Sequence, residues 1–151
     1  MLNGSAVHWE TARERKRLVR LENRITDEEL GLPMWEGWTI AAALAHLAFW
    51  DQRALLLMKK WRIGGVASSP IDDDVTNDSI LPLCSAISPR VAARLAVSAA
   101  EAIDFELENA GADLITDIWH LGKKFRLYRS EHRKLHLDQI EGLLNVRAGK
   151  T

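Results

Sequence analysis

The chain has 151 residues, of which 47% are hydrophobic and 27% charged, a balance typical of a single globular domain covering residues 1–151. The formal net charge of −1 gives no general reason to expect nucleic acid, an anionic membrane or an acidic substrate as a partner. No apolar run reaches the roughly 18 residues of a membrane span. The N-terminal residues lack the apolar core of a signal peptide and the chain has one cysteine, so we expect a cytoplasmic protein.

Two helices are predicted in the first half of the chain. The first covers residues 5–24, and a connector rich in glycine and proline follows it. Thr39 is a good N-cap for the second helix, which runs to about Trp61 and ends at the glycine pair 64–65. Apolar residues surround much of this second helix, which indicates that it is well buried.

A long polar connector follows and continues towards Pro82. Its acidic run, residues 72–78, lacks the glycine and the final glutamate of a calcium-binding EF-hand, so we interpret it as an acidic loop. A connector of this length is often functional or carries a short helix.

Two further helices are predicted in the second half. Ser88-Pro89 supplies an N-cap and a proline at the first helical position of the third helix, which runs to about Ala110. A short segment, 114–119, is either a helical turn or extended. The fourth helix begins between Phe125 and Ser130 and ends near Arg147. No segment shows strand-like alternation, so the sequence predicts an all-α fold of four main helices. The long connection between the second and third helices argues against a simple up-down-up-down bundle.

Three histidines are the strongest candidates for a functional site. His132 and His136 are four residues apart and therefore lie on one face of the fourth helix, and His46 lies in the apolar second helix. Imidazole is a common ligand of transition metals, and three of them would leave coordination positions open, as in a catalytic site. The alternative is that His46 is a hydrogen-bonded core residue and that His132 and His136 are a solvated pair. The helix motif of zinc metalloproteases is absent, because Arg133 stands where its catalytic glutamate would be.

Two sequence motifs carry a family resemblance. Residues 37–51 begin Gly-Trp-Thr and end Leu-Ala-His-Leu-Ala-Phe-Trp-Asp, and residues 132–140 read His-Arg-Lys-Leu-His-Leu-Asp-Gln-Ile. They resemble the second-helix and fourth-helix motifs of the DinB-like superfamily, also called YfiT-like, which includes the N-terminal domain of mycothiol-dependent maleylpyruvate isomerase. The resemblance implies a four-helix bundle with a divalent metal ion on His46, His132 and His136. It also implies kinship with thiol-dependent transferases or isomerases and with hydrolases.

These observations lead to an expected function. We expect a divalent transition metal, zinc or nickel first and iron or manganese as alternatives, that activates water or a low-molecular-weight thiol against a small electrophile. The protein would then be a metal-dependent transferase or hydrolase with a small-molecule substrate. The alternative is a non-catalytic bundle that sequesters or senses a small molecule or mediates protein association. The many large apolar residues also favour a homodimer.

Several residues near the histidines are candidates for supporting roles. Asp51, Asp138 and Gln139 could orient a histidine N–H group, although we expect both aspartates to face solvent. Tyr128 and Arg129 could hold an anionic substrate; the alternatives are a packed ring and a surface salt bridge.

Two other groups of residues are expected to be structural. The basic residues around the start of the fourth helix, Arg129 and Arg133 among them, are interpreted as solvated helix surface rather than a nucleic-acid face. Several of the six tryptophans are expected to fill the core.

Overall fold

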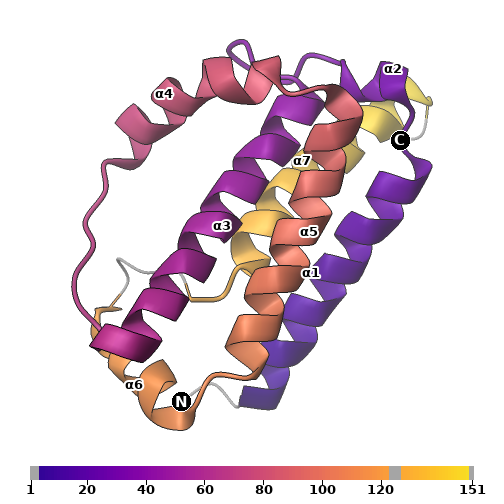
Figure 1. Cartoon of the computed structure of the whole chain (residues 1–151). Helices are drawn as coiled ribbons and strands as arrows, with labels where there is room; N and C mark the ends of the chain where they lie inside the picture. The colour runs from indigo at the N-terminus through magenta and orange to yellow at the C-terminus, as the bar shows by residue number, and fades with distance from the viewer. Residues whose placement is uncertain (1–3, 123–126, 150–151) are drawn as a thin grey trace.

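Figure 1 shows the computed structural model of the chain, in which residues 4–122 and 127–149 are described. Within these residues the regular elements are seven α-helices, and β-structure is limited to one isolated bridge between Pro33 and Thr39. The prediction of an all-α fold is therefore confirmed. The helices are α1 (Gly4–Arg24), α2 (Asp27–Leu30), α3 (Ile40–Gly64), α4 (Asp73–Ala86), α5 (Pro89–Glu108), α6 (Ala112–His120) and α7 (Ser130–Arg147).

The four longest helices, α1, α3, α5 and α7, lie side by side and correspond to the four predicted helices. α3 packs against α5 and α7, and α1 packs against the same two helices. α4 packs against α3 and leads the chain back along it, so α3 and α5 run in the same direction (Figure 1). The long connection thus removes the simple up-down-up-down order, as its length indicated.

The start and end of α3 follow from local chemistry. The Thr39 hydroxyl oxygen accepts a hydrogen bond from the backbone N–H of Ala42 at 3.1 Å, which caps the first turn. At the other end Gly65 has a φ of +85°, a conformation that side-chain-bearing residues rarely adopt, and its N–H donates to the carbonyl of Trp61. The predicted cap and glycine stop of this helix are confirmed.

Two helices, α2 and α4, lie in segments that were predicted to be connectors. In α2, Thr26 and Glu29 form a reciprocal capping box, with each side chain accepting from the other residue's backbone N–H. The interpretation of residues 72–78 as a loop is wrong, because the Asp72 carboxylate accepts from the N–H of Val75 and starts α4. Acidic side chains in a first turn interact favourably with the helix dipole, so the carboxylates that are typical of a loop here stabilise a helix.

The remaining boundaries are close to those predicted. α5 ends at Glu108, near the expected residue 110, and the ambiguous segment 114–119 lies inside helix α6. α7 begins at Ser130, the later limit of the predicted start, whereas the earlier limit, Phe125, lies outside the described residues.

Small residues make up much of the core between α3 and α5. Four alanines of α5 belong to one buried cluster with three alanines from the start of α3, and small side chains allow the two helices to approach closely. The expectation that several tryptophans fill the core is wrong. Only Trp61 is buried; Trp9 and Trp119 are exposed and the other three are partly exposed. Across the described residues, no helix combines the length and the apolar character that a membrane crossing requires.

Candidate metal centre

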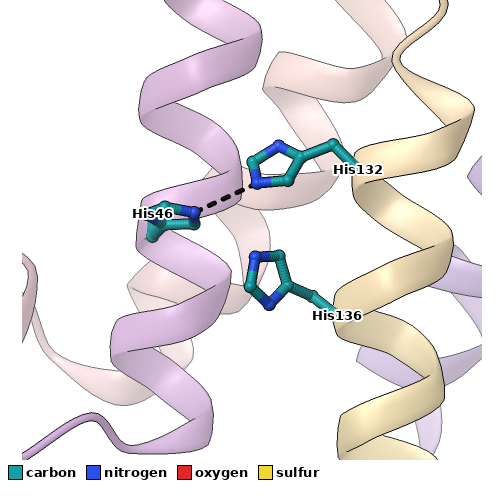
Figure 2. A group of neighbouring side chains, drawn as sticks. All are labelled: His46, His132 and His136. Carbon is teal, nitrogen blue, oxygen red and sulfur yellow. Dashed lines mark hydrogen bonds between the residues drawn. The ribbon is translucent and has the colours of Figure 1, made fainter. Parts of the chain in front are cut away.

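Three imidazole side chains meet between α3 and α7, as Figure 2 shows. His46 comes from α3 and His132 and His136 come from α7, and one nitrogen of each lies within 4.8 Å of the others. The Nε2 atoms of His46 and His132 are 3.1 Å apart. The ring centroids are 4.9–5.0 Å apart in all three pairs. The three histidines therefore lie close enough to hold one metal ion.

The nitrogen positions fit a transition metal after small side-chain movements. Metal–imidazole bonds of about 2.0–2.1 Å place the nitrogens of a tetrahedral set roughly 3.3 Å apart. The pair His46 and His132 is already near that separation, and a rotation of His136 would close the set. No carboxylate or thiolate joins this group among the described residues. Such an ion would therefore keep positions for water or another ligand.

Helix geometry explains why these side chains meet. His132 and His136 are four residues apart, so they project one above the other from α7. On α3, His46, Trp50 and Arg53 follow one another at intervals of four and three residues and share the face that borders a cavity. The two faces are opposed across the α3–α7 contact.

Burial keeps two of the imidazoles neutral at neutral pH. The pKa of His46 is lowered to about 4. Desolvation is the largest cause, and the nearby His136 and the positive charge of Arg129 add to it. Desolvation also lowers the pKa of His136, and this is only partly offset by its hydrogen bond with Gln139. Neutral imidazole is the form that binds a metal, so burial prepares both rings as ligands.

Three tryptophans border the histidines. Trp35 stacks on His136 with ring centroids 5.7 Å apart and an angle of 15° between the planes, and Trp38 and Trp50 approach His46 edge-on. Trp35 and Trp38 lie in the turn before α3, where the N–H of Met34 donates to the carbonyl of Trp38 at 2.8 Å. Sequence reasoning assigned tryptophans to the core and missed this role, although Trp38 directly precedes the N-cap of the histidine-bearing helix.

A cavity of about 900 Å³ opens beside the three imidazoles. Its walls come from α3, α4, α7 and the turn before α3. The α4 wall carries the carboxylates of Asp73, Asp74 and Asp78, and the indole N–H of Trp50 donates to Asn77 at 3.0 Å, which ties this wall to α3. The space suits a small molecule with or without a second one.

A network of buried charges lies on the adjacent side of α7. Arg133 is fully buried and binds Asp104 through two parallel hydrogen bonds of 2.7 Å, and it also contacts Asp51 at 3.2 Å. Asp51 also accepts a bond of 2.6 Å from Nε of Arg129, and Asp104 accepts one of 2.7 Å from Arg15. Burial acts to lower the pKa of Arg133, but Asp51 and Asp104 more than offset it, so the pKa is raised and the guanidinium stays charged.

This network corrects three expectations. Arg129 and Arg133 are buried rather than part of a solvated helix surface, and Asp51 is buried rather than facing solvent. The physical reason is mutual neutralisation, because each charge finds an oppositely charged partner with good hydrogen-bond geometry inside the bundle. A pattern of residue types along one helix does not reveal partners on three other helices.

Each histidine has a different environment at its Nδ1 atom. The Nδ1–H of His136 donates to the side-chain oxygen of Gln139 at 2.9 Å, and Nδ1 of His132 lies 3.0 Å from Nη2 of Arg129. Nδ1 of His46 is buried without a hydrogen-bond partner among the described residues. Gln139 is thus placed to orient a histidine, and Asp51 reaches one only through Arg129.

The other candidates lie away from the imidazoles. Asp138 is exposed and pairs with Lys134 and Arg17, so its expected solvent-facing position is confirmed. Tyr128 packs against Trp119, with ring centroids 5.7 Å apart, and does not border the cavity, which agrees with a packed ring rather than a substrate contact.

Comparison with known proteins finds no family model, no curated protein and no solved structure that matches the chain. The likeness to the DinB-like superfamily therefore stays a prediction from the two motifs. The case for a metal centre rests on the geometry of the three histidines.

Proposed function

We propose that the chain is a DinB-like four-helix bundle that holds one divalent transition metal ion on His46, His132 and His136 and acts on a small molecule in the adjacent cavity. The observation that carries this proposal is the convergence of three imidazoles, two of them kept neutral by burial, at the edge of a cavity of about 900 Å³. Zinc and nickel are the first choices and iron or manganese the next, because imidazole serves all four.

The ligand set determines the kind of chemistry. Three neutral imidazoles leave the charge of a dication uncompensated, so an anionic further ligand is favoured. A metal ion in such a site lowers the pKa of water to about 7 and favours the thiolate form of a thiol, and either product is a nucleophile. We propose attack of this nucleophile on a small electrophile, which makes the protein a transferase or a hydrolase.

The residues around the imidazoles would confine the reactants. The indole rings of Trp35, Trp38 and Trp50 give the cavity an apolar wall next to the histidines, which excludes water from that side. A low-molecular-weight thiol and an electrophile fit together in the space available.

The first test is metal content. Protein purified without an affinity tag should contain, or take up from added Zn²⁺ or Ni²⁺, one ion per chain by elemental analysis. His46→Ala and His136→Ala should lose this ion, whereas His120→Ala, which removes an exposed histidine on α6, should keep it. Unchanged metal content in the first two variants would refute the site.

The second test separates an enzyme from a binding protein. A panel of thiols and electrophiles is assayed with metal-loaded protein, with chelator-treated protein and with His136→Ala. Turnover only in the loaded wild type supports catalysis. Stoichiometric ligand binding without turnover across the panel favours the non-catalytic alternative of sequestration or sensing.

A further inference from the structure

The hydrogen-bond partner of His132 differs in kind from that of His136. His136 donates its Nδ1 proton to the Gln139 oxygen, an acceptor, which leaves the lone pair of Nε2 available for a metal. Nδ1 of His132 faces Nη2 of Arg129 at 3.0 Å, and a guanidinium group has donors only. Nδ1 of His132 must therefore be the acceptor and carry no proton.

This constraint places a proton inside the histidine group. A neutral imidazole without a proton on Nδ1 has it on Nε2, and Nε2 of His132 lies 3.1 Å from Nε2 of His46. His132 is thus the donor and His46 the acceptor in this contact. The proton occupies the space between two of the nitrogens that would hold the ion.

Arg129 is held firmly in the position from which it donates. Its Nε donates to Asp51 at 2.6 Å, the side chain is buried, and Asp51 is itself bound to the fully buried Arg133. The position of the donor is set by the packing of α3 against α7 rather than by a flexible surface side chain.

We infer that Arg129 keeps His132 in the tautomer that cannot bind a metal through Nε2, so that metal loading requires Arg129 to release His132. The inference builds on the proposed function, because it concerns the same site. On loading, the ring proton moves from Nε2 to Nδ1 by exchange with water, and the number of protons on the ring is unchanged. Arg129 therefore opposes metal binding, whereas Gln139 supports it.

The tautomer can be observed directly. Long-range ¹H–¹⁵N spectra of the metal-free protein, with His132 assigned from a His132→Asn variant, should show Nε2 protonated and Nδ1 unprotonated. Added Zn²⁺ should reverse the two signals. A proton on Nδ1 in the metal-free protein would overturn the inference, as would Zn²⁺ bound with Nδ1 still unprotonated.

Metal affinity gives a second test with an unusual sign. Loss of a residue that hydrogen-bonds to a metal ligand usually weakens binding by about 10–100-fold. Arg129→Gln should instead tighten Zn²⁺ binding about tenfold or more, because it removes a charge-assisted bond that must break on loading. Unchanged or weaker binding in a folded Arg129→Gln protein would contradict the inference.

Arg53→Gln is the matched control. Arg53 borders the same cavity from α3 and donates to the backbone carbonyl of Ser69 at 2.8 Å. Its replacement also removes one positive charge at the cavity, but its side chain bonds Ser69 rather than a histidine, so Zn²⁺ affinity should change less than about twofold. An equal gain in both variants would mean that charge, not the tautomer, is responsible, and the inference would be wrong.

Failure of this inference is distinguishable from failure of the proposed function. If wild-type protein binds no metal, the proposed function fails, and the spectrum of the metal-free protein still decides which nitrogen of His132 carries the proton. If the metal binds and that proton is on Nδ1, only the role of Arg129 fails.

Discussion

Two adjacent sides of α7 bury polar groups in opposite ways. One side carries Arg133, whose charge is met by two carboxylates inside the bundle. The other side carries His132 and His136, which face His46 and an open cavity. Among the described residues the buried side-chain atom left without a hydrogen-bond partner is Nδ1 of His46, which faces the second side from α3.

The difference indicates what each side is for. A saturated set of ion pairs has no capacity for a further ligand, so the charged side holds four helices together and fixes their register. Each neutral imidazole beside the cavity has a nitrogen lone pair that can bind a metal ion, and this is what a metal site requires. The buried charge of Arg133 therefore marks structure in this protein, and the buried neutral nitrogen ligands mark the candidate site.

The largest expected effect comes from breaking the charged side. Asp104→Ala leaves Arg133 and Arg15 without one of their partners, and removal of one member of a buried ion pair costs about 3–5 kcal/mol. The free energy of unfolding, measured in urea with chelator present, should fall by that amount. The control, Asp138→Ala, removes an exposed carboxylate and should lower it by less than about 1 kcal/mol. Equal losses would contradict the division between the two sides.

The histidine side should appear in the pH dependence of stability. His46 has a pKa of about 4 in the folded chain against an ordinary value of 6.5, so between these values the unfolded chain binds a proton that the folded chain does not. The contribution of neutral His46 to the free energy of unfolding is therefore fully present above pH 6.5. It is lost as the pH falls towards 4, and the loss is about 3 kcal/mol for His46 alone. The lowered pKa of His136 acts in the same direction.

The measurement is the free energy of unfolding of metal-free protein from pH 7 to pH 5. Carboxylates begin to titrate at the lower end, so wild type is compared with His46→Gln, whose curve should be flatter. Parallel curves for the two proteins would show that His46 is not held neutral by burial.

The smallest effect concerns Gln139. Gln139→Leu removes the acceptor that orients His136, and it should weaken Zn²⁺ binding about tenfold, which corresponds to about 1.4 kcal/mol. Stability should change little, since Gln139 is exposed. Isothermal titration calorimetry with Zn²⁺ compares the affinities of the variant and the wild type. Tighter Zn²⁺ binding by Gln139→Leu would remove the contrast with Arg129.

The features that could be predicted from the sequence are those with local signals. The cap at Thr39, the glycine stop of α3 and the i, i+4 spacing of His132 and His136 depend only on neighbouring residues. The capping box at Thr26 and Glu29 is equally local, but the glycine and proline residues that follow it favour an irregular connector.

The remaining features depend on contacts between distant segments. Arg133 resembles a surface residue until Asp51 and Asp104, on α3 and α5, are brought to it. The tryptophans beside the histidines are partly buried, so hydrophobicity alone assigned them to the core. The acidic residues of α4 line the cavity because that helix packs on α3. No local sequence pattern specifies this packing.

The most direct test is to locate the ion. Crystals grown with Zn²⁺ and measured at the zinc absorption edge should show one anomalous peak between α3 and α7, at about 2.0–2.1 Å from a nitrogen of each of His46, His132 and His136. At least one further coordination position should face the cavity. A peak elsewhere, or an ion whose coordination is completed by protein side chains alone, would contradict the proposed site.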